Sequence, residues 1–213
     1  MAATEDPSPV PFRFVPPREV RAGSLVCRRW REDDAEALFE AVSASAEHLR
    51  PWMPWAKGYD LDGAREFLAR QAPRAAPDGD EPVTDAAYAI CDLDGRILGS
   101  CGLHARLGAG ALEIGYWVDV RATRRGVATL AAALLTETAL MLPGVEGAEI
   151  HHDKANTASG AIPASLGYRH VATVAQKPEA PGEAGVEFQW QMDRDEFPLS
   201  PAANLIEKAR TSN

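Results

Sequence analysis

The stretch that decides the fold runs from Glu113 to Ala128 and reads EIGYWVDVRATRRGVA. It begins inside an apolar-rich run from Ala111 to Val120 whose isoleucine, tyrosine, tryptophan and valines favour a strand. It ends by opening an alanine- and leucine-rich run from Val127 to about Met141, which has the length of a helix. The sequence thus predicts a strand, a short loop and a long helix in direct succession.

The loop in that succession has the composition of an anion site. The first backbone N–H groups of a helix lack intrahelical acceptors and lie at the positive end of the helix dipole. Gly126 lets the backbone approach a bulky anion, and Ala128 keeps the next turn slim. Arg124 and Arg125 add positive charge. We therefore predict a pyrophosphate site, with an ordinary basic helix start as the alternative; neither a Walker GK[ST] nor a GxGxxG fingerprint follows.

The chain before this stretch predicts a strand, two helices and a hairpin. Asp33 and Glu36 form a capping pair for the first helix, which is amphipathic. Residues 48–57 read HLRPWMPWAK, and their two prolines exclude a regular helix, so the tryptophans lie on a bend. Asp94-Gly95 is a strong hairpin turn. The predicted elements are a strand at 24–30, helices at 33–42 and 61–71, and strands at 88–92 and 96–104.

The chain after this stretch predicts two further units of strand and helix. They comprise a strand at 148–152, a short helix ended by Gly167, strands at 168–174 and 186–192, and a tail helix at 202–209. The order β-α-α-β-β-β-α-β-α-β-β predicts the α/β (α+β) class, with a central mixed sheet flanked by helices. We expect a flexible segment over residues 1–12, one domain over 13–195 and a C-terminal tail over 196–213.

The composition excludes several classes of function. With 46% hydrophobic and 25% charged residues, the 213-residue chain is ordinary for a globular protein. No apolar run approaches the roughly 20 residues that span a bilayer, and we expect a cytoplasmic protein without a membrane partner. A net charge of -9 disfavours nucleic acid and favours a cationic substrate such as a protonated amine, although many cytosolic proteins are simply acidic. Cys27, Cys91 and Cys101 lack metal-ligand spacing, so we expect reduced thiols and no metal.

Four motifs, taken together, resemble the GNAT superfamily of N-acetyltransferases. Thr123 to Ala128 is similar to its acetyl-CoA loop, Q/R-x-x-G-x-G/A. Asn156 and Ser159 match its N-x-x-S signature, and Leu166-Gly167-Tyr168 matches L-G-F/Y. Upstream, HLRPWMPW resembles the RimJ/RimL branch, the ribosomal-protein N-terminal acetyltransferases.

The resemblance covers Leu25 to Met192 and implies a GNAT fold, whose two central strands separate to admit the pantetheine arm of CoA. It implies an enzyme that moves the acetyl group of acetyl-CoA to an amine acceptor by direct attack. The residues it assigns to CoA are Val118 and Val120 at the strand edge, the amides of Arg124, Arg125, Gly126, Val127, Ala128 and Thr129, and Asn156 at the sulfur end. It assigns Glu113 as the general base and Ser159 as a proton donor to the thiolate.

Several assignments keep alternatives. Glu113 is either the base or a solvated strand carboxylate, with Glu187 as a second candidate base. Ser159 is either a proton donor or a helix cap, and Asn156 is either a CoA contact or a turn residue. Trp52 and Trp55 form either a substrate wall, which we favour, or core anchors.

The adjacent histidines His151 and His152 point to opposite faces of a strand, so we expect that they do not line one site.

Two departures from the family pattern bear on function. Thr123 replaces the usual Gln or Arg. Pro163 cannot donate a hydrogen bond to the carbonyl of Ser159, so we expect a kinked helix or a first turn only. These departures leave room for a rival hypothesis, an acyl-CoA-binding module with a sensor or interaction role. The sequence leaves the oligomeric state open, a homodimer included.

Overall fold

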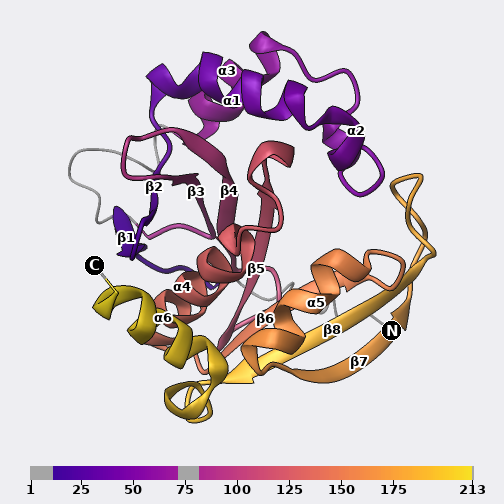
Figure 1. Cartoon of the computed structure of the whole chain (residues 1–213). Coiled ribbons are helices and arrows are strands. Elements are labelled where there is room, and N and C mark those ends of the chain that lie inside the picture. The colour runs from indigo at the N-terminus through magenta and orange to yellow at the C-terminus, as the bar shows by residue number, and fades with distance from the viewer. Residues whose placement is uncertain (1–11, 72–81, 213) are drawn as a thin grey trace, which may run out of the picture.

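The computed structural model describes residues 12–71 and 82–212, and its strands form one mixed sheet (Figure 1). The strands are β1 (Glu19–Ala22), β2 (Leu25–Arg29), β3 (Asp85–Cys91), β4 (Ile97–His104), β5 (Ala111–Val118), β6 (Gly147–Asp153), β7 (Arg169–Ala175) and β8 (Val186–Asp193). The helices are α1 (Ala35–Ala44), α2 (Ala46–Leu49), α3 (Leu61–Gln71), α4 (Val127–Met141), α5 (Thr157–Leu166) and α6 (Pro201–Thr211). Apart from Phe12, the flexible segment expected over residues 1–12 lies outside the described residues.

The sheet is splayed at its centre, as the family resemblance implies. Its strand order is β1-β2-β3-β4-β5-β6-β8-β7, and only the β5–β6 pair is parallel among the described strands. That pair is held by Ala111 with Gly147, Leu112 with Ala148, and Glu113 with Glu149. Beyond Glu113, β5 continues to Val118 against β4, and no described strand pairs with its other edge. The two strands therefore part and leave an opening through the middle of the sheet.

Helices cover the two faces of the sheet separately. Along β3, Tyr88 and Ile90 belong to the core beneath α4 and α6, whereas Ala89 and Cys91 belong to a second core beneath α1 and α3. This division follows from the strand period of two, which sends successive side chains to opposite faces. In Figure 1, α1, α2 and α3 gather at one end of the sheet, and α4, α5 and α6 lie across it. No helix of the described chain is long and apolar enough to cross a membrane.

Most predicted elements are confirmed, with corrections at two ends here and one strand that was not predicted. The strand predicted over 111–120 stops at Val118, and Val120 lies in a 3-10 turn, η4 (Val120–Ala122). The first α-helix begins at Ala35 rather than near Asp33, because Glu32–Asp34 form a preceding 3-10 turn, η1, in which the carboxylate of Asp34 accepts from Arg31 N at 2.8 Å. β1 was not predicted from the sequence because its four residues are too short a run to show a strand, although their burial does alternate.

The tail helix is confirmed as α6, and it is longer than the predicted 202–209. Its Ala202 and Ile206 are buried in the core beneath α4. Of the two outcomes expected from Pro163, the first turn alone is wrong, because α5 continues through Pro163 as far as Leu166, and the kink stays a prediction.

The turn that joins β5 to α4 is fixed by a buried carboxylate. Asp119, 1% exposed, accepts hydrogen bonds from the backbone N–H of Arg121 at 2.8 Å and from its guanidinium at 2.7 Å. Arg121 also reaches Glu40 on α1 at 2.7 Å. Burial by itself would raise the pKa of Asp119, but the hydrogen bonds and charge of Arg121 hold that pKa below its ordinary value. The ionised carboxylate therefore anchors the start of the predicted anion loop.

Asp119→Asn tests this anchor, because it keeps the side chain's size and removes its charge. A carboxylate with a lowered pKa stabilises the fold fully above its ordinary pKa of 3.8 and loses that contribution as the pH falls through the lowered value. We expect the variant to be about 1–3 kcal/mol less stable than wild type at pH 7 by urea unfolding. The difference in unfolding free energy between the two proteins should disappear in acid. A difference that is independent of pH would contradict the role of Asp119 as an ionised anchor.

Candidate active site

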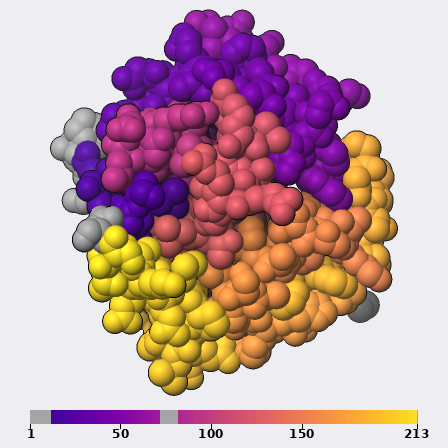
Figure 2. Space-filling model, in the orientation of Figure 1, coloured from indigo at the N-terminus to yellow at the C-terminus, as the bar shows by residue number. Residues whose placement is uncertain are grey.

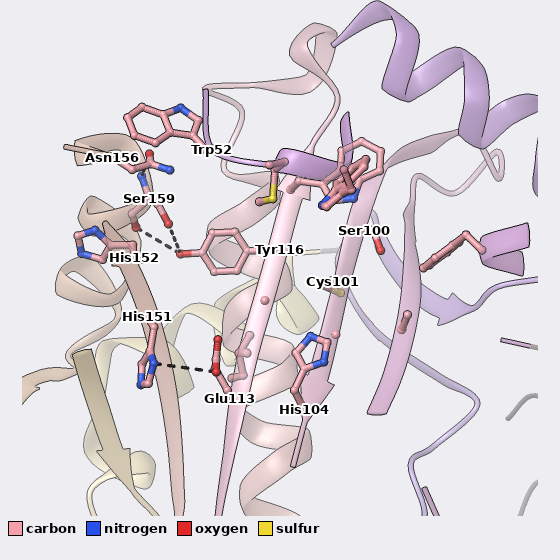
Figure 3. A pocket seen from close by; sticks show the side chains of 18 of the residues that line it. Trp52, Ser100, Cys101, His104, Glu113, Tyr116, His151, His152, Asn156 and Ser159 are labelled. Atoms are coloured by element: carbon pink, nitrogen blue, oxygen red, sulfur yellow. Dashed lines mark hydrogen bonds and ion pairs between the residues drawn. The ribbon is translucent and has the colours of Figure 1, made fainter. Parts of the chain in front are cut away.

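One pocket occupies the opening between β5 and β6, with a volume of about 660 Å³ (Figure 3). In the space-filling view, the surface is hollowed between the coral and orange segments, beneath the purple helices (Figure 2). Such a volume suits a small substrate or the end of a chain. Among the predicted residues, the pocket is lined by Trp52, Trp55, Glu113, Asn156, Ser159 and Glu187. The structure thus brings together residues that are far apart in sequence.

Glu113 lies at the point where the two strands part. Its side chain is 9% exposed, and the guanidinium of Arg106 binds both of its carboxylate oxygens. The carboxylate is therefore a pocket-lining group with a fixed orientation, and not the freely solvated carboxylate of the alternative reading. Arg106 itself lines the pocket and is 63% exposed, which leaves water access to the pair.

An imidazole lies among the carboxylates of this region. His151 Nε2 is 2.7 Å from Glu149, and its Nδ1 lies 3.4 Å from Glu187 and 4.0 Å from Glu113. Burial by itself would lower the pKa of His151, but the hydrogen bond to Glu149 and the charges of Glu113 and Glu187 raise it overall. The site therefore collects negative charge around one titratable ring.

The expectation that His151 and His152 do not share a site is wrong. Both line the pocket, although their rings do lie on opposite faces of β6. The reason is that the pocket passes between β5 and β6, so side chains from both faces of β6 border it. His152 is held by Trp190, whose indole N–H donates to His152 Nε2 at 3.0 Å.

Ser159 and Asn156 open α5 on the other side of the pocket. Asn156 is the N-cap, because its Oδ1 accepts from Ser159 N at 3.1 Å. The alternative that Ser159 caps the helix is therefore wrong: Ser159 lies in the first turn. Its Oγ is 3.3 Å from the hydroxyl of Tyr116 on β5 (Figure 3).

The free edge of β5 offers hydrogen-bonding groups to a ligand. Asp119 N donates to Leu98 O at 2.8 Å, and antiparallel pairs alternate between bonded and non-bonded partners. Val118 and Tyr116 therefore direct their backbone groups away from β4 and into the opening. Val120 does not share this role, which corrects the sequence assignment. Its N–H donates to Ser45 Oγ at 2.9 Å, and its carbonyl accepts from the hydroxyl of Thr123 at 2.8 Å.

The predicted anion loop has the backbone geometry of a phosphate cradle. Arg124 and Gly126 adopt left-handed conformations, with φ of 59° and 76°, and no side chain caps α4. The first helical hydrogen bond runs from Leu130 N to Gly126 O at 2.9 Å. The N–H groups of Val127 to Thr129 therefore have no intrahelical acceptor. A Cβ built on Gly126 would meet nothing within 4 Å, so the glycine faces open space.

An aromatic group lines the pocket on the side of the N-terminal helices. Trp55 lies 5.6 Å from Tyr59 and 6.1 Å from Trp117 between ring centroids, and it is 43% exposed. Trp52 lies at the end of the pocket where Asn156 and Ser159 are found (Figure 3). Pro54 starts a 3-10 turn, η2 (Pro54–Ala56), so the predicted bend is confirmed.

The loop between β7 and β8 bridges to these aromatic residues. Gly182 N donates to Pro51 O at 2.8 Å, and a Cβ on Gly182 would meet that oxygen at 2.6 Å. Asp153 fixes the loop from below by accepting from the N–H groups of Ala184 and Gly185, each at 2.9 Å. The bridge closes one side of the pocket.

Comparison with known proteins identifies the family. The model of the acetyltransferase (GNAT) domain matches residues 24–169. Mycobacterium smegmatis RimJ, solved with a CoA-disulfide, is 25% identical with a TM-score of 0.73, over 94% of this chain and 96% of that chain. RimL, the ribosomal L7/L12 alpha-N-protein acetyltransferase in complex with coenzyme A, is 18% identical with a TM-score of 0.69, over 82% and 97%. The microcin C7 self-immunity acetyltransferase MccE, solved with acetyl-CoA and AMP, is 14% identical with a TM-score of 0.69, over 82% and 97%. No curated protein sequence matches the chain.

The chain belongs to the GNAT acetyltransferase family. It is therefore an acyltransferase, and acetyl-CoA, the donor expected from the sequence, is its acyl donor. The resemblance to the RimJ/RimL branch is confirmed.

Sequence reasoning missed three residues that shape the site. Arg106 is seven residues from Glu113 across a loop, and no spacing rule pairs them. His151 was set aside because it is adjacent to His152. Tyr116 could have been found, because it lies on the strand whose edge opens, on the face opposite to that of Glu113.

Gly126→Val tests the phosphate cradle, and Gly95→Val in the β3–β4 turn is its matched control. Both glycines have a left-handed φ, 76° and 82°, and open space around an added Cβ. Both variants should lose about 1–2 kcal/mol of stability from the backbone conformation. Only Gly126→Val should weaken CoA binding by calorimetry, because its side chain would fill the space that the sequence predicts for the pyrophosphate. Equal CoA affinities for the two variants would contradict the cradle.

Proposed function

We propose that this protein is an N-acetyltransferase that transfers the acetyl group of acetyl-CoA to a primary amine, either a protein N-terminal α-amine or a small-molecule amine. The observation that carries the proposal is that Glu113 and Ser159 line one pocket from two sides of the free edge of β5. A base and a hydroxyl on opposite sides of a thioester are what direct aminolysis needs.

CoA would lie with its pyrophosphate on the amides of Arg124 to Thr129 and its pantetheine arm along Val118. The positive, N-terminal end of the α4 dipole and the two arginines support the pyrophosphate position. The backbone groups that Val118 directs into the opening support the position of the arm. Asn156 at the start of α5 would then lie near the sulfur.

The acceptor's nitrogen would attack the thioester carbon, forming the C–N bond as the C–S bond breaks. Glu113 would accept the proton that nitrogen loses, directly or through water. Ser159 would donate its proton to the departing sulfur, and the proton held by Glu113 would return to Ser159 through water, so the products are the amide and free CoA. Glu187 remains the second candidate base, because it lines the same pocket.

The surroundings of Glu113 favour a cationic acceptor that sheds its proton on binding. Glu113, Glu183 and Glu187 line the pocket with Arg106, and the whole chain carries a charge of -9. The aromatic group at Trp52 and Trp55 would contact the acceptor through burial and cation–π attraction. These features support an amine substrate and leave its size open.

A screen of acceptors tests the proposal. Free thiol released from acetyl-CoA would be measured with N-terminal peptides, polyamines and aminoglycosides as separate panels. Amine-dependent release with one panel supports the proposal and identifies the acceptor class. Absence of release with every panel, despite CoA binding, would instead favour the binding-module hypothesis.

Glu113→Gln tests the general base, because it keeps the size of the side chain but cannot accept the proton. We expect kcat near pH 7 to fall by at least roughly tenfold, with partial recovery at high pH as free amine accumulates. Glu146→Gln is the matched control: Glu146 is 74% exposed, pairs with Arg194 and does not line the pocket, so kcat of this variant should stay near wild type. If Glu113→Gln turns over normally and Glu187→Gln does not, the base is Glu187.

Trp52→Ala tests the aromatic wall. Removal of a ring that contacts the amine should raise KM for the amine and leave KM for acetyl-CoA nearly unchanged, because the two ligands occupy different parts of the site. Steady-state kinetics with each substrate varied in turn would measure both constants. A lower melting temperature with unchanged kinetics per folded molecule would show that Trp52 is a core anchor instead.

A further inference from the structure

Pro163 leaves one carbonyl of α5 without its helical hydrogen bond. A proline has no N–H to donate to the residue four positions earlier, which here is Ser159. The helix nevertheless runs on to Leu166. The carbonyl of Ser159 therefore needs a donor from outside the helix, and an unsatisfied carbonyl here would destabilise the fold.

Tyr116 supplies that donor from across the opening. Its hydroxyl donates to Ser159 O at 3.2 Å and lies 3.3 Å from Ser159 Oγ. The dashed lines in Figure 3 show that this contact joins β5 to α5 directly. Burial raises the pKa of Tyr116 to about 12, although its hydrogen bond with Ser159 acts in the opposite direction, so the phenol keeps its proton at neutral pH.

The geometry also fixes how the hydroxyl of Ser159 can point. A phenol has one proton, and the two oxygens of Ser159 lie at nearly equal distances from it. When its proton is shared between the carbonyl and Oγ of Ser159, Tyr116 occupies an acceptor position of the serine hydroxyl, so the proton of Ser159 is directed away from Tyr116. The remaining space around Ser159 Oγ is the pocket that both residues line.

We propose that Tyr116 is a positioning residue for acetyl transfer, which replaces the hydrogen bond withheld by Pro163 and holds the hydroxyl of Ser159 toward the departing sulfur of CoA. This inference rests on the role proposed for Ser159. It also gives Pro163 a function. Any other residue at that position would have a backbone N–H that donates to the Ser159 carbonyl, and this carbonyl would then no longer depend on Tyr116 or hold it in place.

A kinetic cycle tests whether Tyr116 acts through Ser159. Tyr116→Phe should lower kcat by roughly two- to tenfold, the loss of one neutral hydrogen bond, with KM for acetyl-CoA unchanged. Ser159→Ala should lower kcat by roughly a hundredfold or more. In the Ser159→Ala background, Tyr116→Phe should have no further effect on kcat, because the group that it positions is gone. An equal fold-loss in both backgrounds would overturn the inference.

Tyr88→Phe is the matched control for the loss of a buried phenol. Tyr88 donates to Pro17 O at 2.9 Å and does not line the pocket. The control should shift the urea midpoint without changing kcat. A fall in kcat equal to that of Tyr116→Phe would show that any loss of a buried hydroxyl slows the enzyme, and it would overturn the positioning role.

A double-mutant cycle of stability measurements, the stability cycle, uses Pro163→Ala and needs no activity assay. It tests whether the hydroxyl of Tyr116 replaces the hydrogen bond that Pro163 cannot donate, an exchange of one donor for another. The substituted alanine has a backbone N–H that can donate to the Ser159 carbonyl, so that carbonyl no longer depends on Tyr116. Tyr116→Phe should therefore shift the urea midpoint less in the Pro163→Ala background than in wild type. Equal shifts would overturn the exchange.

The two cycles separate failure of this inference from failure of the proposed function. If wild type releases CoA with an amine but Ser159→Ala keeps its kcat, the acetyltransferase stands and the positioning role of Tyr116 is overturned. If wild type releases no CoA with any amine, the proposed function fails by itself, and the stability cycle still decides whether Tyr116 replaces the missing N–H of Pro163.

Discussion

The parting of β5 from β6 is the constraint on which the rest of the structure depends. The two strands pair over three residues, and the separation beyond Glu113 exposes one edge of β5 inside the molecule. An unpaired strand edge is costly unless something bonds it. The separation therefore leaves backbone N–H and C=O groups of β5 free to bind a ligand. The elements around the opening determine which ligand can reach these groups.

Three anchors keep the walls of the opening in place. Asp119 fixes the turn that leads to α4, and Ser45 at the end of α1 binds the backbone of Val120 in the same turn. On the opposite wall, Asp153 holds the β7–β8 loop, which reaches Pro51 through Gly182. Each of the three anchoring side chains accepts a hydrogen bond from a backbone N–H, which ties the loops in place without long helical packing. Loops that carry function need such support because their apolar contacts are few.

The sequence predicted the local structure well wherever one residue dictates backbone geometry. Gly126 marked the start of α4, Gly167 the end of α5, and Asp94-Gly95 the β3–β4 turn. The end of β5 was misplaced by two residues because Val120 has strand-favouring chemistry, while a tertiary contact from Ser45 draws it into a turn. Local propensity carries no information about a hydrogen bond between residues 75 positions apart.

The candidate site also contains residues that the sequence identified and residues that only the structure identified. Glu113, Asn156 and Ser159 were found because motif spacing carries them, and the structure places all three in one pocket. Arg106 and Tyr116 were not found, because their roles come from contacts across a loop and across the opening. The expectation that Pro163 would limit α5 to a first turn is wrong. A proline removes one hydrogen bond, and a donor from another element can replace it.

The free edge of β5 also bears on how the protein avoids self-association. On the rim of a sheet, a bare strand is a template on which strands of other molecules can add and aggregate. Here the bare edge lies in the interior, with α5 on one side and the tryptophan-bearing bend on the other. A slender chain such as pantetheine can enter between these walls, whereas a second sheet is too broad to do so. With pantetheine along β5, as proposed, this edge would form strand-like hydrogen bonds with the cofactor, while its position inside the molecule would shield it from strands of other molecules.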